Sequence, residues 1–316
     1  MKRSIRIVFI CILAAAALSA AALCAGAAYL VSYALDSASP FALRFDTDEP
    51  DGADQAHQAD IEASFAWLCG IAEDVYIEND GLALHGYLAR RSEEQGARWL
   101  IAVHGYKASA ADMAPFAEWY WRRGWNVLVI DQRAHGLSEG RWIGMGVLEK
   151  NDLLGWIDMV IGLDSDARIA LHGVSMGAAT VMLAAGEALP QNVRCIIEDC
   201  GYSSVAAEFS HQLQEMFHLP PFPLIPLASA IAELRAGWSF SQGDALAALR
   251  RSQVPLLCIH GSADTFVPFS MLDEIYEAAP GDKVRLIVRG AEHARARDTN
   301  PNEYWTAVSL FTAAYV

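Results

Sequence analysis

A serine between two glycines, at the junction of two apolar runs, is the feature that most restricts the fold of this chain. Residues 173–177 read Gly-Val-Ser-Met-Gly. The short run before them, 168–171, predicts a buried strand, and the run after them, 178–185, predicts a helix packed on both sides. So tight a turn leaves no room for a Cβ at either glycine, and it holds Ser175 in a strained conformation with its Oγ exposed, as a nucleophile requires.

Strand and helix patterns alternate through most of the chain. Strands are predicted at 74–78, 82–88, 99–103, 125–130, 168–171, 194–198, 255–259 and 284–288. Helices are predicted near 61–71, 111–123, 153–160 and 178–185, and from about 303 to the C-terminus. Repeated strand–helix units with nearly continuous apolar strands predict an α/β fold with a mainly parallel central sheet and helices on both faces.

The N-terminal residues predict a membrane segment. Lys2, Arg3 and Arg6 precede the run 7–35, which contains no charged residue. This run is long enough to span a bilayer and longer than the apolar region of a typical signal peptide. The cations in front of it predict a single-pass protein of the cell membrane, with a cytoplasmic N-terminus and an extracytoplasmic domain. The alternative is secretion after cleavage near the small residues 25–27.

The composition divides the chain into segments. We expect a membrane anchor or signal segment at 1–35, an acidic tether at 36–60 and one α/β domain at 61–316. A long insertion at about 201–243 is apolar and proline-rich in its middle, which is typical of a lid, with ordinary packing over the sheet edge as the alternative. The net charge of −15 argues against nucleic acid as a partner.

A serine nucleophile needs a base and an acid that orients the base. In a sheet of this kind these groups follow in the order serine, acid, histidine, at the carboxyl ends of successive strands. Asp264 follows the strand at 255–259, and His293 follows the strand at 284–288. Asp199, which ends the strand at 194–198, is the competing acid.

The nucleophile also needs donors for a developing oxyanion. The backbone N–H of Met176, at the start of the helix after the serine, is one candidate. The backbone N–H of Tyr106, in the loop after the strand at 99–103, is the second, because Gly105 lets the backbone approach closely.

No metal or organic cofactor is expected. The six cysteines form no C-x-x-C pair and no metal-ligand spacing. Cys195 and Cys258 lie in apolar strand-like runs, which indicates buried small side chains. A disulfide that involves Cys200 stays open.

Five motifs together resemble a known family. They are His-Gly-Tyr at 104–106, Asp-Gln-Arg-Ala-His-Gly-Leu-Ser-Glu-Gly at 131–140, the run at 173–177, His-Gly-Ser-Ala-Asp at 260–264 with Val-Pro at 267–268, and Glu-His-Ala at 292–294. From about residue 74 onward the chain is similar to the α/β-hydrolases, and within them to bacterial serine hydrolases of the serine-aminopeptidase-like group. The motifs are specific for the fold and poorly specific for the substrate.

The resemblance implies an α/β-hydrolase fold with Ser175, Asp264 and His293 as a catalytic triad. It implies the N–H groups of Tyr106 and Met176 as oxyanion donors. We expect a hydrolase that cleaves small-molecule or acyl carboxylic esters through an acyl-serine. Two alternatives stay open: a peptidase or amidase with the same triad, and a non-catalytic binding protein on this fold.

Overall fold

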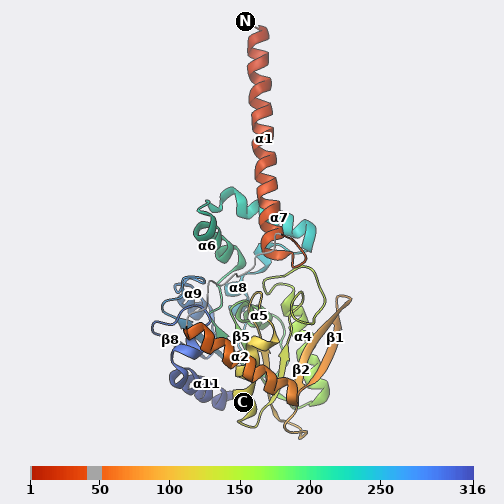
Figure 1. Ribbon diagram of the computed structural model, residues 1–316, viewed down its shortest axis with the longest axis vertical. Helices are drawn as coiled ribbons and strands as arrows, with labels where there is room; N and C mark the ends of the chain where they lie inside the picture. The colour runs from red at the N-terminus through yellow and green to blue at the C-terminus, as the bar shows by residue number, and fades with distance from the viewer. Residues whose placement is uncertain (1, 41–51) are drawn as a thin grey trace.

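The computed structural model describes residues 2–40 and 52–316, and its centre is an eight-stranded sheet (Figure 1). The strand order is β1-β2-β4-β3-β5-β6-β7-β8. The first two pairs in this order, β1 with β2 and β2 with β4, are antiparallel, and the other neighbours are parallel. The strands are β1 (Glu73–Asn79), β2 (Leu82–Ala89), β3 (Arg98–Val103), β4 (Asn126–Ile130), β5 (Arg168–Val174), β6 (Val193–Asp199), β7 (Leu256–Gly261) and β8 (Lys283–Val288). The predicted α/β-hydrolase fold is confirmed.

Helices cover both faces of this sheet. One face is packed by α4 (Glu149–Leu163), α5 (Met176–Ala185), α8 (Ala245–Leu249) and α9 (Met271–Ala278). The other is packed by α2 (Gly52–Ile71), α3 (Ala110–Trp121) and α11 (Pro301–Tyr315). The remaining helices are α1 (Lys2–Leu35), α6 (Val205–Phe217), α7 (Pro221–Ala236), η1 (Phe240–Gln242) and α10 (Ala296–Thr299). Of these, α1, α6, α7 and η1 lie beyond the carboxyl ends of the parallel strands and form a third cluster.

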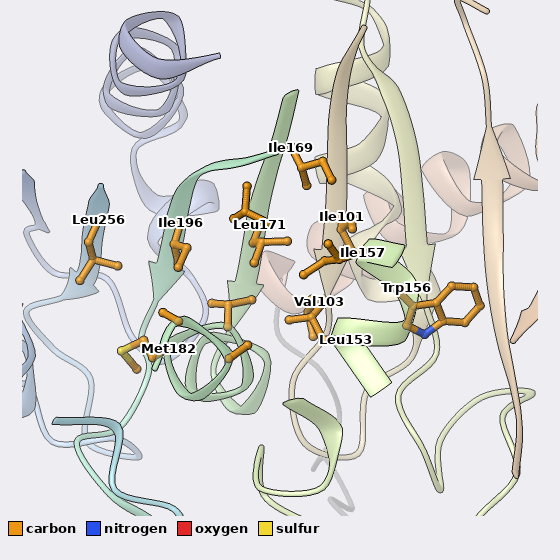
Figure 2. Packing of buried hydrophobic residues seen from close by; sticks show 14 of the residues in the cluster. Ile101, Val103, Leu153, Trp156, Ile157, Ile169, Leu171, Met182, Ile196 and Leu256 are labelled. Carbon is orange, nitrogen blue, oxygen red and sulfur yellow. The ribbon is translucent and has the colours of Figure 1, made fainter. Parts of the chain in front are cut away.

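The core on the α4 and α5 side packs against the middle of the central strands. Ile101 of β3, Leu171 of β5 and Ile196 of β6 pack against Trp156 of α4 and Met182 of α5 (Figure 2). Each of these side chains is at most 1% exposed. Fully burying a side chain of this size contributes roughly 1.5–3 kcal/mol. Alternate residues of the same strands point to the opposite face, so each strand reads as apolar throughout.

The N-terminal helix α1 has two parts. Residues 5–25 are exposed along their whole length, and the helix projects away from the domain (Figure 1). Ala27, Val31 and Leu35, one turn apart, are buried against the helices α6 and α7. The segment Ile5–Leu35 is long and apolar enough to cross a membrane, a property that N-terminal signal sequences share.

The predicted acidic tether differs from the structure. Residues 41–51 lie outside the described part of the chain, but residues 52–60 belong to α2, which begins well before the predicted helix. The acidic side chains of this part form ion pairs with the α10 region: Asp54 with Arg295, and Asp60 with Arg297 at 2.7 Å. These pairs and the burial of Leu68 hold the helix on the domain. The other domain boundaries stay a prediction.

Candidate active site

The turn that carries Ser175 has the strained geometry that the sequence predicts. Ser175 has φ 56° and ψ −116°, and it joins the end of β5 to the start of α5. A Cβ on Gly173 would lie 2.2 Å from the carbonyl oxygen of Gly177, and a Cβ on Gly177 would lie 2.0 Å from that of Val103. Only glycine fits at either position. Ser175 as a whole is only 7% exposed, so it borders a cavity and does not lie on the open surface. Residues of α1 and of the 201–243 insertion line a cavity directly above it.

The structure brings together the three side chains that follow β5, β7 and β8. Nε2 of His293 lies 2.9 Å from Oγ of Ser175, and Nδ1 lies 2.8 Å from Oδ2 of Asp264. With a proton on Nδ1, the imidazole donates to the carboxylate and accepts from the serine hydroxyl. The backbone N–H groups of Phe266 and Val267 donate to the other carboxylate oxygen, at 3.0 and 2.9 Å. The acid is therefore fixed on both of its oxygens.

The electrostatics keep Asp264 ionised. Burial alone would raise the pKa of its carboxyl group, but interactions with His260 and His293 outweigh burial and lower the pKa to about 2. His260 lies 3.2 Å away on the same oxygen that His293 contacts. An ionised carboxylate at this position favours the tautomer with its proton on Nδ1 and would stabilise a protonated imidazole.

Asp199, the competing acid, is oriented elsewhere. Its Oδ2 accepts a hydrogen bond from the Tyr304 hydroxyl at 2.8 Å, and its side chain is buried. Burial raises its pKa to about 6. Its backbone carbonyl accepts from the N–H of Ser175 at 2.8 Å. Asp199 therefore braces the serine turn through its backbone, and its side chain bonds to α11 rather than to His293.

The loop after β3 passes directly beside the serine. A Cβ on Gly105 would lie 3.3 Å from Cβ of Ser175, so the backbone leading to Tyr106 is in contact with the turn. Met176 is the first residue of α5, and the first N–H groups of a helix have no acceptor within it. Both predicted donors therefore border the serine. Their role in binding an oxyanion stays a prediction.

The motif at 131–140 braces this loop. Oδ1 of Asp131 accepts from the N–H of Ala110 at 2.8 Å, and Nε2 of His135 accepts from the N–H of Lys107 at 3.1 Å. A Cβ on Gly136 would lie 2.1 Å from the Asp131 carboxyl group. The motif thus fixes the position of the loop and contributes no side chain to the reacting centre.

Two cavities meet at Ser175. The first, here called the apolar pocket, is lined by parts of α1, α6 and α7: Leu30, Val31, Tyr33, Ala34, Leu35, Tyr106, Met145, Ser175, Met176, Tyr202, Glu208, Phe209, Gln212, Leu213, Met216, Phe217, Ile225, Ala228, Phe240, Phe266 and Val267. The second, here called the polar pocket, includes His57, Asp112, His293 and Arg297 in its lining. The sequence did not predict the contribution of α1, because a uniformly apolar run shows no preferred face.

Glu208 of α6 is a second residue that sequence reasoning missed. It lines the apolar pocket and is 2% exposed. Its Oε1 accepts from Nε2 of Gln212 at 2.9 Å, and its Oε2 has no hydrogen-bond partner among the described residues. Burial raises the pKa of this carboxyl group to about 8. A protonated, neutral side chain is the form that suits an apolar pocket near neutral pH.

One group of metal-type ligands was found among the described residues, formed by Cys200, Asp264 and His293. Both ring nitrogens of His293 already have hydrogen-bond partners, Ser175 and Asp264. Burial raises the pKa of the Cys200 thiol well above its ordinary range, whereas metals bind the thiolate. The three side chains are therefore better suited to the hydrogen-bond network than to binding a metal ion. Cys200 is a free, buried thiol and forms no disulfide.

Comparisons with known proteins agree with this fold. The family model described as serine aminopeptidase, S33, matches residues 95–219. The protein YqkD of Bacillus subtilis, which is uncharacterized, is 30% identical over 213 residues, covering 67% of this chain and 70% of that protein. The Pyrococcus furiosus esterase Pf2001 has a TM-score of 0.63 and 23% identity, over 79% of this chain and 95% of that one. An acylaminoacyl peptidase of Pyrococcus horikoshii has a TM-score of 0.58 and 16% identity, over 77% of this chain and 40% of that one.

Proposed function

Because the chain belongs to the α/β-hydrolase superfamily, we propose that this hydrolase cleaves carboxylic esters through an acyl-serine intermediate, with Ser175 as nucleophile. The observation that carries the proposal is the continuous hydrogen-bond chain from Ser175 through His293 to Asp264, with donor–acceptor distances of 2.9 and 2.8 Å. A nucleophile, a base and an orienting acid in contact are the arrangement that acyl transfer needs.

The steps follow from this geometry. As Oγ of Ser175 attacks the ester carbonyl carbon, Nε2 of His293 takes the hydroxyl proton. Asp264 holds the ring and stabilises its positive charge. The N–H groups of Met176 and Tyr106 bind the negative oxygen. The tetrahedral intermediate then collapses, the bond to the leaving alcohol breaks, and His293 returns the proton to that alcohol. Water cleaves the acyl-serine by the same steps and releases the acid.

The apolar pocket suits the acyl group of an ester better than the charged end of a peptide with a free amino terminus, whereas the polar pocket includes the acidic side chain of Asp112. An aminopeptidase substrate carries a protonated amine, which calls for an anionic partner. Among the described residues that line the apolar pocket, Glu208 carries the one acidic side chain, and its raised pKa of about 8 keeps it neutral near pH 7. The family model, described as a serine aminopeptidase, supports a peptidase as the alternative, so esters and peptides need a direct comparison as substrates.

A fluorophosphonate probe and a panel of esters and aminoacyl amides test the proposal. Ser175→Ala should lose both probe labelling and ester turnover, because the probe reacts only with an activated serine. Ser270→Ala is the matched control, since Ser270 is exposed and its side chain makes no capping hydrogen bond. Labelling that persists in Ser175→Ala would place the nucleophile elsewhere. Aminoacyl amides turned over faster than every ester would establish a peptidase.

We also propose that α1 spans the cell membrane once, with the N-terminus in the cytoplasm and the hydrolase domain outside. The support is the length and apolar character of Ile5–Leu35 and the cations at its start. The alternative is a secreted protein released by cleavage of a signal peptide, and N-terminal sequencing of the mature chain distinguishes the two.

A further inference from the structure

The end of α1 is a wall of the cavity that contains Ser175. Val31 and Leu35 are at most 1% exposed, and both line the apolar pocket. The Tyr106 hydroxyl, in the loop beside Ser175, donates to the carbonyl oxygen of Ala34 at 2.6 Å. The Tyr33 ring packs edge-on against Phe217 of α6, with 5.8 Å between the ring centres. The same helix that is apolar enough to cross a bilayer therefore continues directly into the pocket.

The length of the exposed part of α1 places the membrane close to this pocket. Residues 5–25 are exposed, and at 1.5 Å per residue they extend over roughly 30 Å. The hydrocarbon core of a bilayer is also about 30 Å thick. From Gly26 onward the helix is partly or fully buried against the domain at every described position except Tyr29, which is exposed. The membrane surface then lies near Gly26, where α1 leaves the domain, less than two turns from Val31 in the pocket wall.

The helices around this exit point expose large apolar side chains. Met216, Leu219, Phe222 and Leu234, here called the apolar rim, are 43, 41, 77 and 86% exposed. They belong to α6, α7 and the short connection between them, which surround the base of α1 in Figure 1. A Cβ on Gly26 would lie 4.0 Å from the Leu224 side chain. Leu224 is two residues after Phe222 on α7, so this part of the apolar rim lies close to the point where α1 leaves the domain. Exposed side chains of this size, gathered beside a bilayer-spanning helix, suit insertion into lipid.

From these observations we propose that the substrate is an ester lipid of the surrounding membrane, whose long acyl chain enters between α1 and the apolar rim and lies in the apolar pocket. This inference rests on the proposed esterase function. The acyl chain of the lipid lies along Val31 and Ala34, and this position brings the ester carbonyl to Ser175. The leaving alcohol, with the polar head group, occupies the polar pocket beside His293.

The reaction balances with water as the co-reactant. The acyl carbon forms a bond to Oγ of Ser175, the ester C–O bond breaks, and the head-group alcohol leaves with the proton from His293. Water then cleaves the acyl-serine and yields the free fatty acid. The acid leaves along the same apolar path, which returns it to the bilayer.

Two pairs of variants in the full-length protein, reconstituted in vesicles of palmitoyl-oleoyl phosphatidylglycerol, test the proposal. Ala34→Trp fills the pocket wall, and Ala21→Trp makes the same change on the exposed part of α1. The ratio of kcat/KM for a palmitoyl ester to that for a butyryl ester should fall about tenfold or more in Ala34→Trp, since methylene-sized changes in an apolar pocket cost at least this much. It should stay unchanged in Ala21→Trp.

The second pair probes the rim without touching the pocket. Phe222→Ser should slow the release of fatty acid from the vesicle lipid. Leu310→Ser, which changes a similarly exposed side chain on α11 (70% against 77% for Phe222), should not. Fluorophosphonate labelling of Ser175 shows that each variant is folded. A wild-type protein that turns over butyryl esters but releases no fatty acid from the vesicles overturns this inference and leaves the esterase function standing. Absence of all ester turnover and of labelling overturns the esterase function itself.

Discussion

Glu208 should make the stability of the domain depend on pH in a way that one substitution removes. Its carboxyl group is 2% exposed, has one hydrogen-bonded oxygen and one without a partner, and has its pKa raised to about 8 by burial. In the unfolded chain the same group has a pKa near 4.5. Between these two values the folded protein holds a proton that the unfolded chain has lost.

The sign and the size follow from this difference. Because Glu208 binds its proton more tightly in the native state than in the unfolded state, its contribution to the free energy of unfolding falls as pH rises from about 4.5 to about 8, and this contribution is constant outside the window. Each pH unit in the window is worth at most about 1.4 kcal/mol, which gives an upper limit of about 5 kcal/mol in total. At roughly 2–4 °C per kcal/mol for a domain of this size, Tm should fall by several degrees.

Thermal unfolding of the wild type and of Glu208→Gln at pH 5 and pH 9 measures the effect. Glutamine keeps the shape of the side chain and cannot titrate. The difference in Tm, Glu208→Gln minus wild type, should therefore increase by several degrees from pH 5 to pH 9. Glu215→Gln, an exposed position on the same helix, is the control and should show no such change. Parallel pH dependences for the wild type and Glu208→Gln would refute the reasoning, since Glu208 would then be ionised in the native state or hydrated.

Three further predictions concern the site, the turn and the anchor. Asp264→Asn should lower kcat for a short ester by a factor on the order of 10⁴, and Asp199→Asn by much less, because of these two acids Asp264 is the one hydrogen-bonded to His293. A larger loss of kcat in Asp199→Asn would identify Asp199 as the catalytic acid. Gly177→Ala should destabilise the domain by about 3 kcal/mol or more in thermal unfolding. Gly70→Ala should not, because its added Cβ meets no atom of the described residues within 4 Å; equal effects would contradict the steric account. The mature protein should pellet with membranes, keep its N-terminus on sequencing and expose its domain to protease added outside spheroplasts; a soluble chain that begins near Ala28 would establish a cleaved signal peptide.

The sequence alone determined the sheet and the order of the candidate site residues, because both depend on local patterns. A strand buried on both faces is apolar at nearly every position, so the strands can be read directly from the chain. The requirement for glycine at 173 arises within one turn, because an added Cβ there would meet the backbone of Gly177, whereas the requirement at 177 comes from the end of β3. Asp264 and His293 follow strands whose carboxyl ends lie at one edge of a parallel sheet, so their proximity to Ser175 follows from the topology.

The tertiary structure alone decided which groups complete the cavity. Asp199 ends β6 and Asp264 lies in the loop after β7, and only the path of that loop directs the Asp264 carboxylate to His293, while the Asp199 carboxylate bonds to Tyr304. Glu208 is an ordinary helix residue until the insertion folds over Ser175 and buries it. The docked face of α1 has no signature in the sequence, because every face of that helix is apolar and only the position of α6 and α7 selects the side that becomes the pocket wall.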